Sequence, residues 1–343
     1  MTAPPKRILI IKTSSLGDIV CSLPVLSQLR NLYPEARIGW VVDSRFADLL
    51  AADRRIDELL VFHRTRRPSR AMLAEIAAFC AELRHLGRRL RANTWDVAKD
   101  LQSLLKTALI LSSSGARIRI AEFARPRHFF SLFAANKRVR PRASHAVVRY
   151  LEIAAPLGVR PDQVDFGLQP SEEARAWSEQ QVAELQRPRV AVNVGTARPE
   201  KMWPPDGFAE AIAAARAEYG PFALVYTGTR AEAPAAEYVY ARTGGPAVNV
   251  AGRTTLQQLV ALLDACDILL TPDSGPMHIM AALGRPVVAL FGPTDPAKNG
   301  PWGNQHVVIR SPTGRMTDIS PETVGHELAQ LLARLGARGL AAP

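Results

Sequence analysis

The chain has 343 residues, of which 47% are hydrophobic and 22% charged, a composition typical of a soluble globular protein with room for two domains. Its three cysteines, Cys21, Cys80 and Cys266, form no CxxC motif, which excludes a disulfide scaffold and argues against a zinc site. The net charge of +11 comes entirely from residues 1–165, which hold 28 Lys and Arg against 15 Asp and Glu; residues 166–343 hold 15 against 17. An excess of positive charge confined to one half of the chain predicts an anionic partner such as a polyanion or a membrane surface.

No apolar run is long enough to span a bilayer, and the run after Arg7 is ended by Lys12 too soon for a signal peptide. Few, unpaired cysteines are typical of a reducing compartment. We therefore expect a cytoplasmic protein.

Strand and helix patterns alternate through the first half of the chain. In chain order the patterns predict a strand at 7–11, a helix to about Tyr33, a strand at 37–42, a helix at 71–90, and strands at 95–101 and 117–121. Residues 123–142 are irregular and basic, as expected of a loop or short helices at a working surface.

The same alternation of strand and helix patterns resumes after residues 156–174, a stretch rich in Pro, Gly and acidic residues that is predicted to be a linker. Strands are predicted at 189–194, 222–228, 247–252, 267–272 and 286–292, and helices at 207–219, 254–266 and 321–336. The helix at 254–266 opens with a predicted capping box from Thr254 to Gln257. Strand–helix alternation predicts α/β domains with parallel sheets, here two Rossmann-like domains facing a central cleft, at 1–165 and 166–320. Residues 321–343 would add a C-terminal helix that could pack back on the N-terminal domain.

Asp18 follows the turn after the first predicted strand. In an open parallel sheet, ligands bind beyond the carboxyl ends of the strands, so this carboxylate is expected at the mouth of the cleft. The alternative is a helix N-cap that accepts backbone N–H groups. The turn contains neither GxGxxG nor GxxxxGK[ST], so a phosphate cradle is not expected here. Pro24 would either kink the following helix or stand near its first turn.

The stretch DILLTPDSGPMHIMAALGRP predicts a strand, a turn and a helix that starts near Gly275. Asp273 and Ser274 stand in the turn, and His278 falls in the first helical turn. Bare N–H groups and the helix dipole at such a start favour an anion, for example a diphosphate. His278 is either a ligand to that anion or a half-buried structural residue.

Two further loops carry groups that could bind a phosphate or a ribose. Thr196 and Lys201 follow the strand at 189–194, where a lysine can neutralise phosphate charge. Glu232 follows the strand at 222–228, where a carboxylate commonly binds ribose hydroxyls. The alternative for Lys201 and Glu232 is an ordinary solvated surface position.

The segments KTSSLGDIVCSLPVL, EKMWPPDGF and PDSGPMHIMAALGRPVVALFGPTDP resemble the ADP-heptose:lipopolysaccharide heptosyltransferases of glycosyltransferase family 9, most closely the heptosyltransferase I branch. The resemblance covers nearly the whole chain. It implies a GT-B fold and an inverting, metal-independent transferase that moves L-glycero-D-manno-heptose from ADP-heptose to the Kdo–lipid A inner core of lipopolysaccharide. No cofactor is implied, since ADP-heptose is the donor substrate.

The resemblance also implies roles for single residues. Asp18 would be the catalytic base, and residues 1–165 would bind an anionic, lipid-linked acceptor at the cytoplasmic face of the inner membrane. The donor would contact Thr196, Lys201, Glu232, Thr254, Asp273, Ser274, Gly275 and His278, and Thr254 stands where the family often has a methionine near the adenine. Candidate acceptor contacts in the basic half are Arg64, Arg66, Arg67, Lys106 and Arg125.

Three alternatives stay open on the sequence. A family-9 transferase of the heptosyltransferase II kind would use a different acceptor or donor. A GT-B sugar-nucleotide epimerase would need no basic acceptor face. A non-enzymatic binder of anionic lipid would need the basic half but neither Asp18 nor Lys201.

Overall fold

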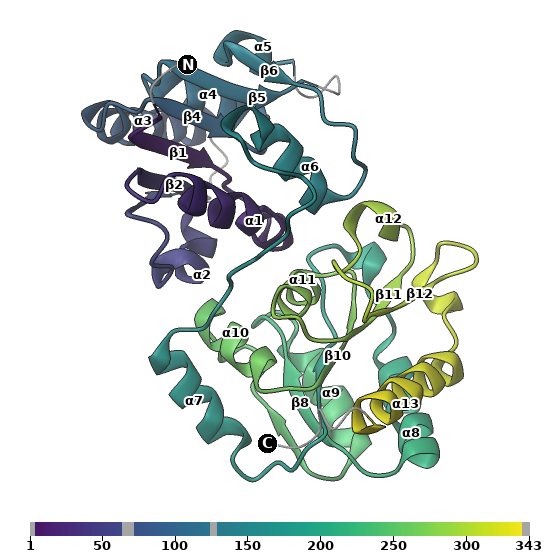
Figure 1. Cartoon of the computed structure of the whole chain (residues 1–343). Coiled ribbons are helices and arrows are strands. Elements are labelled where there is room, and N and C mark those ends of the chain that lie inside the picture. Colours follow the sequence, from purple (N-terminus) through teal and green to yellow (C-terminus); the bar gives the residue numbers. More distant parts are fainter. Residues whose placement is uncertain (1–3, 64–71, 124–128, 338–343) are drawn as a thin grey trace. The chain divides into compact units, whose positions relative to one another are not determined.

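The computed structural model describes residues 4–63, 72–123 and 129–337, and the chain divides into two compact units between Gly167 and Leu168 (Figure 1). That division falls two residues beyond the domain boundary at 165 that the sequence predicts. Each unit is an α/β domain with its own sheet and its own core.

The first unit contains six strands and the helices between them. Its strands are β1 (Arg7–Ile11), β2 (Arg37–Asp43), β3 (Glu58–Phe62), β4 (Val97–Asp100), β5 (Ile118–Glu122) and β6 (Lys137–Val139). Its α-helices are α1 (Leu16–Leu32), α2 (Ala47–Ala51), α3 (Met72–Ala92), α4 (Leu105–Ser113), α5 (Ser131–Ala134) and α6 (Ala146–Ala154).

The second unit repeats this construction. Its strands are β7 (Arg189–Asn193), β8 (Ala223–Thr227), β9 (Ala247–Asn249), β10 (Ile268–Pro272), β11 (Val287–Phe291) and β12 (Val307–Arg310). Its α-helices are α7 (Glu172–Val182), α8 (Pro205–Tyr219), α9 (Ala233–Thr243), α10 (Leu256–Asp264), α11 (Gly275–Ala282), α12 (Pro296–Asn299) and α13 (Pro321–Ala337).

The first sheet is parallel and has the order β3-β2-β1-β4-β5-β6. Helices α3 and α4 cover one face, where Leu9, Ile11 and Ala98 belong to a buried apolar core. Helices α1 and α6 pack against each other on the other face. The strands are apolar almost throughout because both faces of the sheet are covered.

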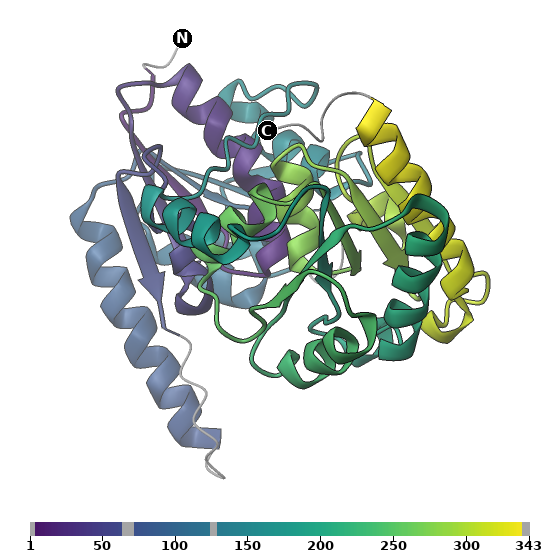
Figure 2. The same ribbon diagram turned by 90° about the horizontal axis from the view of Figure 1, so that it is seen from below.

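The second sheet is also parallel, in the order β12-β11-β10-β7-β8-β9. One face is covered by α8, α9 and α13, which share a core with the inward residues of the strands. Both views show α13, in yellow, alongside α8 (Figures 1 and 2). The close approach of these two helices depends on Gly325, where a Cβ atom would come within 2.7 Å of the Ala211 carbonyl oxygen.

Two local features differ from the sequence predictions. Helix α1 begins at Leu16 and contains Pro24, so the alternative in which Pro24 stands near the first turn of the helix is wrong. The capping box of α10 joins Thr255 to Gln258 rather than Thr254 to Gln257. Helix α13 buries its apolar side against α8 within the second unit, and its packing on the N-terminal domain stays a prediction.

The edge strands β3, β6 and β12 were not predicted at all. They are short or only half-buried, so their apolar alternation is weak. Within the described parts of the chain, no helix combines the length and the apolar character that crossing a membrane requires.

Candidate active site

The two sheets share one topology, in which the strand order reverses next to the first strand of each unit. The reversal falls between β1 and β4 in the first sheet and between β7 and β10 in the second. Outside the carboxyl ends of the strands at such a point lies the usual ligand crevice of an open α/β sheet. Asp18 follows the carboxyl end of β1 in the first unit. Thr196, Lys201 and Asp273 follow the carboxyl ends of β7 and β10 in the second.

Asp18 stands in the first turn of α1, three residues after the N-cap Ser15. Its Oδ2 atom accepts hydrogen bonds from the backbone N–H of Ser15 at 3.2 Å and from the Ser15 hydroxyl at 2.9 Å. The capping alternative is therefore correct for one oxygen, although the cap residue itself is Ser15. The Asp18 side chain is 40% exposed, so the carboxyl group is partly accessible to solvent.

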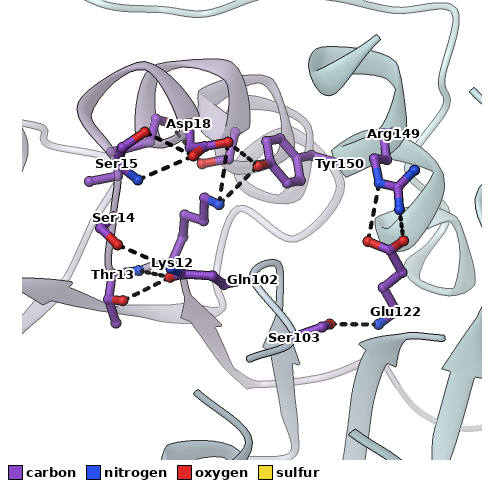
Figure 3. Close-up of polar contacts among 12 residues, drawn as sticks. Lys12, Thr13, Ser14, Ser15, Asp18, Gln102, Ser103, Glu122, Arg149 and Tyr150 are labelled. Carbon is purple, nitrogen blue, oxygen red and sulfur yellow. Dashed lines mark hydrogen bonds and ion pairs between the residues drawn. The ribbon is translucent and has the colours of Figure 1, made fainter. Parts of the chain in front are cut away.

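The second oxygen of Asp18, Oδ1, faces two buried side chains from other elements (Figure 3). The hydroxyl of Tyr150 on α6 donates to it at 2.5 Å, and the Lys12 ammonium lies 3.7 Å away. Lys12 Nζ also donates to the Tyr150 hydroxyl at 2.9 Å. The three side chains form one network that joins the end of β1, the start of α1 and the middle of α6.

The network favours the ionised form of Asp18. Burial alone would raise the pKa of this carboxyl, but the Lys12 charge and the hydrogen bonds from Tyr150 and Ser15 outweigh burial and lower the pKa to about 2. Burial lowers the pKa of Lys12 against the attraction of Asp18, and it raises the pKa of Tyr150 well above its ordinary value. Asp18 is thus a carboxylate at any physiological pH.

The loops around this network are tied to the neighbouring strand ends. Gln102, after β4, accepts hydrogen bonds from the Thr13 backbone N–H and hydroxyl at 3.1 and 2.8 Å. Glu122, at the end of β5, is ion-paired with Arg149 next to Tyr150 (Figure 3). These contacts hold the turn before α1 and the start of α6 in place.

Only one predicted acceptor contact lies within the described residues. Lys106 stands at the start of α4, with its Nζ atom 5.2 Å from the centre of the Phe62 ring. The other four predictions lie outside the described residues: Arg64, Arg66, Arg67 and Arg125.

In the second unit, Asp273 accepts hydrogen bonds from two of the residues that are candidates for binding the sugar-nucleotide donor, Thr196 and Lys201. Its Oδ2 atom accepts hydrogen bonds from Lys201 Nζ at 2.6 Å and from the Thr294 hydroxyl at 2.7 Å, while the Thr196 hydroxyl donates to its backbone carbonyl at 3.1 Å. The side chains of Lys201 and Asp273 are only 13% and 7% exposed. Lys201 is therefore held at the carboxyl end of β10, and the solvated-surface alternative is wrong for this residue.

The backbone N–H groups at the start of α11 are not capped by the Ser274 side chain and could bind an anion. Ser274 is the N-cap, but its side chain makes no capping hydrogen bond, because its hydroxyl instead pairs with Thr271 at 2.8 Å. Gly275, at the first helical position, carries no side chain that could cover the turn. His278 is half-buried in the first turn. An uncapped start with the dipole behind it favours negative charge.

Glu232 lies directly against the loop after β7. Its Oε2 atom accepts the Thr229 backbone N–H at 2.6 Å, and its Cδ atom lies 2.0 Å from where a Cβ atom on Gly195 would stand. Glu232 therefore lies beside the loop that carries Thr196. Thr254 is half-buried just before α10.

Among the residues of these networks that were not predicted as site residues are Lys12, Tyr150, Asn193 and Thr294. Asn193 is buried, and its Nδ2 atom donates to the Gly195 carbonyl at 2.8 Å and the Thr271 hydroxyl at 3.0 Å, which joins the ends of β7 and β10. A charged or amide residue ending an apolar strand was a usable signal for Lys12 and Asn193. Tyr150 and Thr294 carry no such signal.

Two tandem Rossmann-like domains of this strand order form the GT-B architecture of glycosyltransferases. The crystal structure of the Escherichia coli heptosyltransferase WaaC with ADP has the same fold, with a TM-score of 0.75 and 23% identity over 95% of this chain and 99% of that chain. The model of glycosyltransferase family 9 (heptosyltransferase) matches residues 83–327, and the chain belongs to this family.

Two E. coli K12 relatives match along nearly their whole length. Lipopolysaccharide heptosyltransferase 1 is 26% identical over 335 residues, covering 95% of this chain and 100% of the relative. Lipopolysaccharide heptosyltransferase 2 is 28% identical over 356 residues, covering 95% and 98%. Such similar identities do not separate the two branches, so the heptosyltransferase I assignment stays a prediction.

Proposed function

We propose that this enzyme transfers L-glycero-D-manno-heptose from ADP-heptose to the Kdo–lipid A inner core of lipopolysaccharide, with inversion at the anomeric carbon and with Asp18 as general base. The observation that carries the proposal is the state of Asp18, an ionised and partly exposed carboxylate at the strand reversal of the first sheet. Family membership supports the transferase over the epimerase and lipid-binder alternatives. The donor is supported by the E. coli structure that holds ADP.

The proposed reaction is a single displacement. The acceptor hydroxyl oxygen forms a bond to the anomeric carbon, and its proton passes to Asp18. The bond from that carbon to the diphosphate oxygen breaks, and its electron pair leaves on ADP. Lys201 and the uncapped start of α11 would stabilise the charge that develops on the diphosphate. Glu232 would accept hydrogen bonds from the ribose hydroxyls.

The variant Asp18→Ala tests the base assignment. It should abolish heptose transfer, while ADP-heptose affinity, measured by calorimetry, stays within about twofold because the donor groups lie in the other unit. Turnover at the parent rate would refute the assignment.

The acceptor is proposed to be anionic and lipid-linked, bound by Arg64, Arg66, Arg67, Lys106 and Arg125 of the basic half. The double variant R66A/R67A should raise the acceptor KM by more than the donor KM. The opposite pattern would remove these arginines from the acceptor site.

We also place the enzyme in the cytoplasm, at the inner face of the inner membrane. An aromatic patch, defined as Phe129, Phe130 and Phe133, supports this placement, because all three rings are exposed and pack edge to face. Exposed cations follow it at Lys137 and Arg138. Exposed phenylalanine beside cations suits an anionic membrane surface, where each cation contributes about 1 kcal/mol.

Vesicle co-sedimentation tests this membrane contact. The double variant F129S/F133S should bind vesicles that contain anionic phospholipid less than the parent does. Val308→Ser, at an exposed apolar residue of the second unit, is the control. Equal binding by all three proteins would argue against the patch.

The second candidate function is transfer to a heptosylated core, as in the heptosyltransferase II branch, which the 28% identity to that relative supports. Supplying Kdo–lipid A and its heptosylated product as alternative acceptors would separate the branches. A thermal-shift screen of ADP-heptose against UDP- and GDP-sugars would test the donor.

A further inference from the structure

We propose that Lys12 and Tyr150 are positioning residues for the reaction: they form an ordered chain of donors that keeps one oxygen of Asp18 aimed and ready to take the acceptor proton. The inference rests on the proposed role of Asp18 as base. It adds two residues that belong to neither of the predicted binding sets and that come from two other elements of the fold.

The direction of the chain follows from the chemistry of its members. The Lys12 ammonium can only donate, so its 2.9 Å hydrogen bond runs from Nζ to the Tyr150 oxygen. The Tyr150 hydroxyl hydrogen is then left to point at Asp18 Oδ1, 2.5 Å away. Hydrogen bonds aligned in this way polarise one another, and the one that ends on a carboxylate is the stronger, charge-assisted kind.

Counting acceptor sites identifies the reactive oxygen of Asp18. Each carboxylate oxygen accepts about two hydrogen bonds. Both sites on Oδ2 are taken by Ser15, whereas the hydrogen bond to Oδ1 found among the described residues comes from Tyr150, with the Lys12 ammonium 3.7 Å from the same oxygen. The remaining site on Oδ1 is therefore the place for the acceptor hydroxyl, and Tyr150 fixes the direction in which that site points.

The chain is held by rigid parts of the fold. The Lys12 side chain is 3% exposed, and its Nζ lies 4.6 Å from the centre of the Tyr150 ring. The Lys12 carbonyl accepts the indole N–H of buried Trp40 at 3.1 Å. Tyr150 belongs to α6, which packs along α1, the helix that carries Asp18. Side chains held by packing in this way keep a fixed orientation, which flexible surface side chains could not do.

The charges around the network determine how the Asp18 pKa should change when Lys12 or Tyr150 is replaced. Lys12 and Tyr150 are the two main opponents of burial at Asp18, so without either one burial would raise the Asp18 pKa, more strongly when the Lys12 charge is lost. The other charged or titratable groups that act on the network are Cys21 on α1, Asp100 at the end of β4, and Arg149 and Glu152 on α6.

The experiment measures kcat/KM for the acceptor from pH 4.5 to 8 in Tyr150→Phe and Lys12→Met. In the parent, Asp18 stays ionised across this range. A raised Asp18 pKa leaves less of the base ionised at the acid end of this range, so kcat/KM should fall between pH 8 and pH 5 in both variants. We expect a loss of about tenfold for Lys12→Met and about threefold for Tyr150→Phe.

Two matched controls separate positioning from general damage. Tyr33→Phe removes a tyrosine hydroxyl of the same unit that donates to the Leu157 carbonyl at 2.9 Å. Lys99→Met removes another buried amine, on β4, which lies opposite Ile10 in the strand pairing and has no hydrogen-bond partner among the residues that the structure describes. Both controls should keep the parent pH profile, whatever they do to stability.

The outcomes are distinguishable. A parent-like profile in both Tyr150→Phe and Lys12→Met, with Asp18→Ala inactive, overturns the inference alone. Full activity of Asp18→Ala overturns the proposed function with it. If Lys12→Met does not fold, Tyr150→Phe decides, together with a carbon-13 NMR titration of the Asp18 carboxyl, which must show a raised pKa in that variant.

Discussion

The contact between Gly195 and Glu232 allows the donor site to be changed without altering any polar group. A Cβ atom at residue 195 would stand 2.0 Å from Glu232 Cδ and 2.3 Å from its Oε1 atom. Only the end of a flexible side chain is in the way, so Gly195→Ala should displace the carboxylate and leave the backbone unchanged. Glu232 would lose its hydrogen bond from Thr229 and the position from which we propose that it binds the ribose.

The size of the effect follows from the hydrogen bonds that depend on this carboxylate. A hydrogen bond to a charged group contributes about 1.5–3 kcal/mol. Loss of one ribose contact of that strength weakens binding by about 10- to 150-fold. We therefore expect Gly195→Ala to raise the ADP dissociation constant into that range and to match Glu232→Ala.

The assay is titration calorimetry with ADP, and thermal unfolding serves as a check on the fold. The control is Gly336→Ala on α13, where a methyl group would lie 3.8 Å from the Tyr219 hydroxyl, an ordinary van der Waals distance. Parent-like affinity of Gly195→Ala would refute the reasoning, because it would mean that the Glu232 carboxylate does not bind the nucleotide from this position.

Three further predictions follow from individual contacts. Burial raises the pKa of Asp100 to about 6, so its contribution to stability is complete below about pH 4 and is lost as the pH rises through 6. Asp100→Asn should abolish this loss, which amounts to about 1.4 kcal/mol in urea unfolding between pH 5 and pH 7.5. Thr294→Val removes one of the two side-chain hydrogen bonds to the Asp273 carboxylate and should lower kcat by about tenfold, and an unchanged kcat would exclude Thr294 from the site. Gly325→Ala should destabilise the protein by about 1–3 kcal/mol by separating α13 from α8, whereas Gly336→Ala on the same helix should not; equal unfolding free energies would contradict this packing.

Much of the fold could be predicted because local patterns carry it. The central strands β1, β7 and β10 are continuous apolar runs, each followed by a polar turn and a helix. That pattern predicts a parallel α/β sheet without any knowledge of contacts. The edge strands β6 and β12 could not be predicted because half-buried strands lack such a run.

Residues of the candidate site could be predicted only where a polar side chain follows the carboxyl end of a predicted strand. Asp18, Lys201 and Asp273 follow the carboxyl ends of central strands, so the general rule for ligand sites in open sheets was enough to select them. The same rule could not say that Lys201 pairs with Asp273, 72 residues away, at 2.6 Å. Spacing along the chain contains no information on which turns meet.

The sequence by itself determined the class of fold, the excess of positive charge in the first half, and the acid at the end of the first strand. Only the tertiary structure decided how that acid is held. Tyr150 lies 132 residues beyond Asp18 and reaches it because α6 packs on α1. A periodic pattern records which face of a helix is buried, but the partner of a single polar group depends on how two helices meet, and no local pattern encodes that.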